Sequence, residues 1–343
     1  MRLESLDRDD PDANKVYMNV LFSTVPQAQT AFDTTSGEIY ASLLSQAGTD
    51  GIARARRLIA RSHEVHTEGL GVWGGVSGRT GSLDGDGNAA KVDAHEFGFD
   101  FGVDYRGQDN RWALGASGGY VDGQTQVDDR LSRAKYDGWH LGAYGRVGSG
   151  GPGLTVSGAI DYTKIEASVS RGIVVNTLNR MAWSDAGIRT VSLSGEVRYG
   201  VAVGKDWSIG PVASIHHASA KLGRISETGA NALNLTSDGG KDKLTRYGGG
   251  LAAHLQSDKG SIDVSAQYVD GPRNSAWVPL VLQGAPDASF PVSSPRTDGG
   301  AGLFTISGHH TLGGGWTVSG EARALAGKHE TSVAGSVTVG LTF

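Results

Sequence analysis

The sequence contains no cysteine in its 343 residues, and this absence removes several classes of site at once. A disulfide scaffold, a zinc site with cysteine ligands and a thiolate nucleophile are all excluded. The 31 basic and 36 acidic residues leave a net charge of −5. The chain therefore has no basic footprint for nucleic acid, and we expect no nucleic-acid partner. No apolar run approaches the roughly 18 residues that a transmembrane helix needs.

Glycine, by contrast, is abundant. The 53 glycines make up about 15% of the chain, roughly twice ordinary usage. Each glycine inside a helix costs on the order of 1 kcal/mol, so this composition argues against a mostly helical protein. No three-residue period of the collagen type accompanies the glycines.

From Gly69 onward, apolar and polar residues alternate with a period of two. Between Val92 and Tyr105, aromatic and apolar side chains occupy one face, and acidic residues and glycines occupy the other. The stretches 191–203 and 331–343 repeat this pattern. Strict alternation of this length predicts strands rather than helices. Twelve such runs are expected at 69–79, 92–105, 110–122, 134–147, 153–166, 187–203, 206–219, 244–256, 260–270, 300–311, 315–326 and 331–343.

The connections between these runs differ in length in a regular way. Those after even-numbered runs are short, and those after odd-numbered runs are mostly long; the long ones are 80–91, 123–133, 167–186, 220–243 and 271–299. Outer-membrane barrels have tight periplasmic turns and longer extracellular loops. The sequence therefore predicts an all-β fold, a 12-stranded antiparallel transmembrane β-barrel over 68–343. We expect a monomer in the lipid of the cell outer membrane of a Gram-negative bacterium, with extracellular long loops and a periplasmic carboxy terminus.

The first 67 residues have a different character. Residues 24–47 contain apolar residues at helical spacing, and a second run follows Asp50, a suitable N-cap residue. The second run carries four arginines, Arg54, Arg56, Arg57 and Arg61. This is the composition of a helix with a basic face. A helix is about 10–12 Å across with its side chains. The lumen of a barrel of twelve strands is intermediate in width between that of a small barrel, which side chains fill, and that of a large barrel with an open channel. We therefore expect the helix in the lumen.

Residues 32–42, FDTTSGEIYAS, resemble the L-D-x-L-S-G-E-x-H-A-S element that precedes the β-domain of autotransporters, the type V secretion family. The arginine-rich run then leads into the sequence VWGG at 72–75, and the DGDGN turn at 84–88 also matches. The chain ends on an aromatic residue, Phe343, as family members do. The resemblance covers roughly residues 25–343.

The resemblance implies a translocator domain that exports and surface-anchors an amino-terminal passenger. It implies residues 1–35 as a linker or passenger remnant, 36–67 as a helix in the lumen, and the barrel assembly machinery as a partner. The terminal strand would carry the assembly signal, at Val339, Leu341 and Phe343. The missing passenger departs from the family pattern, and residues 1–12 lack the apolar core of a signal peptide. We therefore interpret the chain as a fragment of a longer protein.

Several strings match catalytic or metal-binding patterns without the context that these patterns need. A GxSxG string at 115–119 lies inside a predicted strand rather than at a strand-to-helix turn. A GxGxxG string at 69–74 is not followed by a helix. The first polar residues of 84–95 have the spacing of a calcium-binding loop, but the twelfth position is His95 rather than the glutamate that such a loop needs. No Asn-Asn pair for self-cleavage occurs in the helix. We expect no catalytic, metal or cofactor site.

The alternation places charged residues in the lumen, because arginine at the lipid mid-plane costs about 2–4 kcal/mol. The predicted luminal acids are Glu96, Asp100, Asp104, Asp161, Glu196, Asp263 and Glu321. The predicted luminal arginines of the wall are Arg79, Arg111, Arg146, Arg198, Arg246 and Arg323. Two interpretations stay open at this point. In the first, the charged residues of the wall form ion pairs with one another. In the second, the acids of the wall bind Arg54, Arg57 and Arg61, which form one stripe on the helix, and Arg56 lies away from this stripe.

Two other functions also stay open. A diffusion porin would share the alternation and the loop lengths but would not need residues 25–64. An outer-membrane hydrolase would need a serine, a histidine and an acid in one place, and the sequence does not offer such a set.

Overall fold

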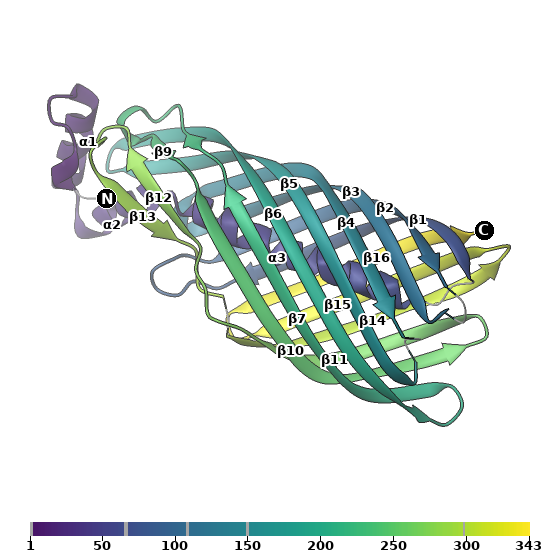
Figure 1. Cartoon of the computed structure of the whole chain (residues 1–343). Helices are drawn as coiled ribbons and strands as arrows, with labels where there is room; N and C mark the ends of the chain where they lie inside the picture. The colour runs from purple at the N-terminus through teal and green to yellow at the C-terminus, as the bar shows by residue number, and fades with distance from the viewer. Residues whose placement is uncertain (1–2, 65–67, 108–109, 149–150, 298) are drawn as a thin grey trace.

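The computed structural model describes residues 3–64, 68–107, 110–148, 151–297 and 299–343, and its main feature is a closed antiparallel barrel of twelve strands (Figure 1). The predicted fold class is confirmed. The barrel strands are β1 (Gly69–Leu83), β2 (Val92–Arg106), β3 (Trp112–Val127), β4 (Ser132–Val147), β5 (Gly153–Val175), β6 (Leu178–Val203), β7 (Trp207–Leu222), β10 (Gly240–Ser257), β11 (Gly260–Asp270), β14 (Gly300–Gly313), β15 (Trp316–Gly327) and β16 (Glu330–Thr342).

The barrel closes where its first and last strands meet. β1 pairs with β16 from Gly71 opposite Thr342 to Leu83 opposite Glu330. Beyond the last paired residue, the backbone N–H of Phe343 still donates to the carbonyl of Leu70 at 2.9 Å. Closure leaves no strand edge with unpaired backbone groups, which is the condition for spanning a membrane with strands.

The two faces of each strand follow the alternation in the sequence. On β2, Phe97, Phe99 and Phe101 point outward and are each more than half exposed, whereas Asp100 and Asp104 point inward and are 3% exposed. A band of apolar side chains therefore covers the outside of the barrel, and polar side chains fill the inside, as in outer-membrane barrels.

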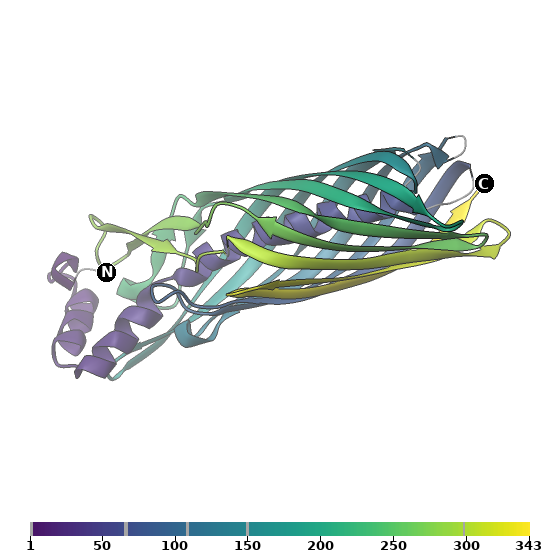
Figure 2. The ribbon, with the colours of Figure 1, turned by 90° about the horizontal axis from the view of Figure 1, so that it is seen from below.

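In the described residues before β1, three α-helices precede the barrel: α1 (Pro11–Leu21), α2 (Val25–Thr35) and α3 (Glu38–His63). In Figure 2, α3 runs along the inside of the barrel, while α1 and α2 lie beyond its end. No helix in the described ranges is long and apolar enough to cross a membrane. The last part of the predicted helical segment, 65–67, lies outside the described residues.

The predicted division of the helices was wrong at two points. The break lies at Gly37, whose left-handed φ of 72° separates α2 from α3, and not before Asp50. Asp50 is an interior residue of α3 rather than an N-cap. Its carboxylate is bound instead by Gln46, by Arg79 of β1 and by Tyr136 of β4, which explains how an aspartate is accommodated there. The separate helix α1 was not predicted.

The end of the barrel that carries the long connections is also more ordered than predicted. The prediction of a loop over 167–186 was wrong. Instead, β5 continues to Val175 and β6 begins at Leu178, so the two strands form a long hairpin. The predicted loops 220–243 and 271–299 contain four short strands, β8 (Ile225–Ser226), β9 (Leu235–Ser237), β12 (Trp277–Leu282) and β13 (Ser289–Ser293). They form a separate sheet in the order β13-β12-β9-β8. We call this sheet, together with α1, α2 and the tip of the β5–β6 hairpin, the cap.

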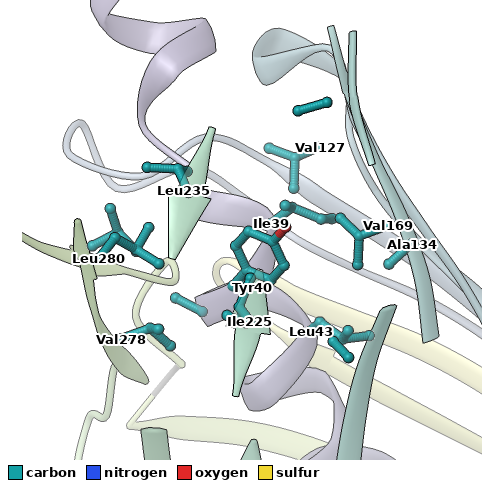
Figure 3. Packing of buried hydrophobic residues seen from close by; sticks show 14 of the residues in the cluster. Ile39, Tyr40, Leu43, Val127, Ala134, Val169, Ile225, Leu235, Val278 and Leu280 are labelled. Atoms are coloured by element: carbon teal, nitrogen blue, oxygen red, sulfur yellow. The ribbon is translucent and has the colours of Figure 1, made fainter. Parts of the chain in front are cut away.

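A hydrophobic core joins the cap to the barrel. Ile39, Tyr40 and Leu43, from the first turns of α3, pack against Leu235 and Leu280 of the cap sheet (Figure 3). Residues of the barrel wall, including Val127, Ala134 and Val169, complete the same cluster. The start of α3 is therefore buried in a packed core rather than in an open pore.

A buried ion pair crosses this core. Arg171 of β5 binds Glu227 at 2.7 Å, with both side chains at most 1% exposed. The Tyr40 hydroxyl donates to the same carboxylate at 2.7 Å, and the Leu235 N–H donates to it at 2.8 Å. Arg171 also donates to the carbonyl of Thr34 in α2 at 2.8 Å. One guanidinium and one carboxylate thus connect α2, α3, the cap sheet and the barrel.

A second ion pair attaches α1 to the cap. Arg180 of β6 binds the carboxylate of Asp12, and the Ala232 N–H donates to the same group at 3.1 Å. The hydrogen bond from Arg180 lowers the pKa of Asp12 below its usual range. The pKa of Asp12 is therefore lower in the folded protein than in the unfolded chain. The contact stabilises α1 fully when the pH is above the unfolded pKa, and this stabilisation is lost as the pH falls through the folded pKa.

We expect Arg171→Gln to open the cap, because it leaves Glu227 buried without its cation, a change that costs about 3–5 kcal/mol. Hydrogen exchange of residues 225–237 in the folded protein measures the opening. Arg224→Gln is the matched control, because the Arg224–Asp238 pair is more than four-fifths exposed on both sides. Equal protection of this segment in the two variants would contradict the role given to the buried pair.

Candidate functional site

The site to be considered is the contact between α3 and the inner wall of the barrel. The helix packs mainly against β3 to β7 and β10. On this side the wall is shaped for close approach: a Cβ at Gly142 would meet Leu58 of the helix. Leu58 and Ile59 join Trp73, Tyr144 and Ala159 in a small apolar cluster inside the otherwise polar lumen. The helix is thus seated against one side of the wall by packing.

Three arginines of α3 bind three acids of β2. Arg54 reaches Glu96 at 2.7 Å, Arg57 reaches Asp100 at 2.8 Å, and Arg61 reaches Asp104 at 2.9 Å. The order is the same in the helix and in the strand. Helix α3 and strand β2 both run away from the cap. The chain enters the barrel from the cap in α3, returns toward the cap in β1 and runs away from it again in β2. We call these three contacts the charge ladder.

Further wall residues hold the two ends of the ladder. At the cap-proximal end, Arg54 also donates to Thr163 at 3.1 Å and lies 3.5 Å from Asp161. At the other end, the Tyr144 hydroxyl donates to Asp104 at 2.9 Å and accepts from the Trp73 indole at 3.0 Å. The Arg61 guanidinium lies 5.1 Å from the centre of the Trp73 ring, a cation–π contact.

His140 of β4 was not singled out in the sequence, yet it lies at the centre of the ladder. Its Nε2 is 2.9 Å from Asp100 and its Nδ1 is 3.1 Å from Asp161. It therefore bridges two of the acids that also face arginines of α3. The alternation of β4 puts His140 on the inner face, so this signal was present in the sequence.

The remaining predicted acids pair with other cations. Glu196 lies 2.6 Å from Arg198 and 3.3 Å from His63. Asp263 lies 3.1 Å from Arg198 and 3.2 Å from His254. Glu321 binds Arg323 of the same strand. Both interpretations left open by the sequence thus hold in part: four acids meet the helix arginines, and three pair with arginines of the wall.

The predicted wall arginines also have individual partners. Arg79 binds Asp50 of α3, Arg246 binds Glu330, and Arg146 donates to the carbonyl of Asn110 at 2.9 Å. The placement of Arg111 in the lumen was wrong. It lies before the first residue of β3 and is exposed, because the strand begins only at Trp112.

The strings that matched other chemistry have structural roles. Ser117, from the GxSxG string, lies in the interior of β3, and the chain continues as a strand for ten residues beyond it, to Val127, rather than turning into a helix. In the DGDGN turn, Asp86 accepts hydrogen bonds from the backbone of Asn88 and Ala89 at 3.0 and 2.9 Å, so its carboxylate caps its own turn. In the described ranges, no three His, Asp or Glu residues are grouped so that they could hold a metal ion.

Comparison with known families supplies the decisive observation. The model of the autotransporter β-domain family matches residues 72–323, most of the barrel. The chain belongs to this family. The family that the sequence resembles is thereby confirmed, by a match that does not include residues 32–42 or Phe343. No curated protein matches this autotransporter β-domain.

Solved structures of other autotransporters share its fold. The translocator domain of NalP from Neisseria meningitidis is 17% identical, with a TM-score of 0.70 over 90% of this chain and all of that one. The transport unit of AIDA-I from Escherichia coli is 16% identical, with a TM-score of 0.55 over 79% of this chain and 90% of that one. The β-domain of the Bordetella autotransporter BrkA is 16% identical, with a TM-score of 0.53 over 80% of this chain and all of that one.

The family match and the shared fold identify the chain as an outer-membrane β-barrel translocator domain of a Gram-negative bacterium. The predicted function is confirmed at this level, in preference to the diffusion porin. The family and the fold are those of a translocator barrel, not of a known enzyme.

We expect the triple variant Arg54→Gln, Arg57→Gln and Arg61→Gln to open the pore more often, because the ladder no longer holds α3 against β2. Each ladder cation is at least four-fifths buried, so the pairs are screened less than surface pairs. Single-channel recording in planar bilayers across a salt series measures the opening. The parent should open more often as the salt rises, and the variant should depend less on salt.

The control is Arg133→Gln, Arg189→Gln and Arg224→Gln, which removes the same charge from exposed positions. If the ladder variant gates like the parent at every salt concentration, packing alone holds the helix and the ladder has no such role.

Proposed function

We propose that this domain exports a passenger attached on the amino-terminal side of α1 and then anchors it at the cell surface, with α3 left in the lumen as a plug. The observation that carries the proposal is the charge ladder, because a diffusion porin has no need for a helix paired along its wall. In this account residues 1–35 are the linker or passenger remnant, 36–67 the plug segment and 68–343 the barrel.

The orientation that we propose is supported by where the ends of the chain lie. We propose that the cap and the long connections face the outside of the cell and that the carboxy terminus faces the periplasm. In Figure 1 the amino-terminal helices and the carboxy terminus lie at opposite ends of the barrel. A passenger joined before α1 would therefore extend from the cap. The short turns would lie at the periplasmic end, as in other outer-membrane barrels.

The plug is held by contributions of different kinds. Exposed ion pairs are each worth about 0–1 kcal/mol, and burial strengthens a pair but also costs it hydration, so we assign the ladder on the order of 1–3 kcal/mol in total. The packing of Leu58 and Ile59 against the wall and the burial of Ile39, Tyr40 and Leu43 in the cap core add to it. The passenger would lie outside while this combination keeps the pore closed. The account involves no bond chemistry and no cofactor.

Removing residues 36–64 should raise single-channel conductance while the barrel stays folded, because the deletion empties the lumen. The matched control removes residues 3–21, which include α1 and lie outside the barrel, and should leave the conductance unchanged (Figure 2). Heat-modifiable migration in gels checks that each barrel is folded. Unchanged conductance after the first deletion would mean that α3 does not close the pore.

We further propose that the domain inserts as a monomeric barrel with help from the barrel assembly machinery, which reads the terminal strand. The proposed signal consists of Val339, Leu341 and Phe343. Val339 and Phe343 are 44% and 73% exposed on the outer face. Phe343 lies at the closing seam, beside the first residues of β1.

Phe343→Asp should lower the amount of barrel in the outer membrane of cells at least several-fold, while refolding into detergent suffers less. The control is Val147→Asp, an equally exposed position, at 68%, at the same end of the barrel on β4. It changes the outer surface in the same way but leaves the terminal signal intact. Equal membrane levels of the two variants would contradict recognition of the terminus.

A further inference from the structure

Arg56 differs from the other arginines of α3. Arg54, Arg57 and Arg61 each bind a carboxylate of β2, whereas Arg56 points toward a different part of the wall. In the described ranges, its Nε and Nη2 atoms are buried and have no hydrogen-bond partner. Buried charges in proteins are normally paired, because an unpaired ion loses its hydration without compensation. An anion that the protein itself does not supply would resolve this.

The guanidinium faces a hollow between α3 and the wall. Because the helix packs mainly against β3 to β7 and β10, space remains on the side of β14 to β16. One hollow there is lined by Arg56, Arg246, Arg323 and Glu330 together with Leu303 and Leu325. A second hollow shares Arg56 and Arg323 with the first.

The charged neighbours of Arg56 bind one another. Arg246 is paired with Glu330, and Arg323 binds Glu321 and donates to the carbonyl of Ala53. On the other side, Glu196 and Asp263 share Arg198, and Glu196 also lies beside His63. The charged groups that act most strongly on Arg56 are two more cations, Arg323 and Arg246. In the described ranges, none of these acids forms a hydrogen bond with the Nε or Nη2 atom of Arg56.

The free atoms of Arg56 also define what kind of anion fits. Nε and Nη2 form one edge of the guanidinium, with two parallel N–H groups. This edge matches two oxygens of one oxyanion and gives a pair of parallel charge-assisted hydrogen bonds. A monatomic anion such as chloride accepts both hydrogen bonds at one centre, so the two bonds converge instead of running parallel and fit the edge less well.

We propose that the lumen of this domain contains a binding site for a small free oxyanion of the phosphate type, held by the Nε–Nη2 edge of Arg56 and the positive field of Arg246 and Arg323. The anion supplies the two acceptors that Nε and Nη2 lack, on the side of α3 opposite the ladder. The site is separate from the export function and does not depend on it.

Binding of inorganic phosphate to the full chain, folded in detergent, tests this directly. The line width of the phosphate ³¹P resonance is measured at constant pH and ionic strength, with chloride as the other anion. The parent should broaden the resonance saturably, and chloride should compete poorly. Arg56→Gln should bind phosphate at least tenfold more weakly, whereas the exposed control Arg224→Gln should bind like the parent.

Two further measurements keep the test decisive. Arg56→Lys retains the charge but loses the two-donor edge, so it should also bind more weakly than the parent. In crystals of the parent soaked in selenate, an anomalous peak should lie beside Arg56, which decides the question even if a variant fails to fold. The proposal is overturned by an absence of saturable phosphate binding, by equal binding in Arg56→Gln, by equal competition from chloride or by an empty selenate map.

Discussion

We propose that the plugged barrel depends above all on one interaction, the pairing of three arginines of α3 with three acids of β2. It requires a lumen close to the width of one helix, which a closed sheet of twelve strands provides. It also requires that the helix and the strand run in the same direction, so that Arg54, Arg57 and Arg61 meet Glu96, Asp100 and Asp104 in order. The chain path, down through α3, up β1 and down β2, supplies that direction without any further element.

The cap and the ladder act on different parts of the same helix. The first turns of α3 are fixed in an apolar core that contains the Arg171–Glu227 pair, and its second half is fixed by polar contacts to the wall. Salt does not screen apolar contacts, whereas it weakens ion pairs, though buried pairs less than exposed ones. Release of the plug would therefore begin at the ladder end when salt weakens the pairs, while the cap core still holds the entry of the helix.

Much of this arrangement could be predicted from the sequence because it depends on local periodicity. Alternation assigns each residue of a strand to one face, and it correctly placed Glu96, Asp100 and Asp104 inside and Phe97, Phe99 and Phe101 outside. The cap could not be predicted, because β8 and β9 are two and three residues long and their pairing is set by contacts distant in sequence. Asp50 was misread as a helix start because its partners, Arg79 and Tyr136, lie on other elements. His140 was overlooked although its position on β4 already placed it inside.

The most direct measurement of the central claim is a double-mutant cycle on the middle contact of the ladder, with Arg57→Gln, Asp100→Asn and both together. Asp100 also faces His140, and the cycle separates the pair from that second contact. The readout is the open probability of single channels at low and at high salt. We predict a coupling between the two residues on the order of 1 kcal/mol at low salt, which shrinks at high salt. Effects that simply add at both salt concentrations would show that this ion pair does not hold the helix in the barrel.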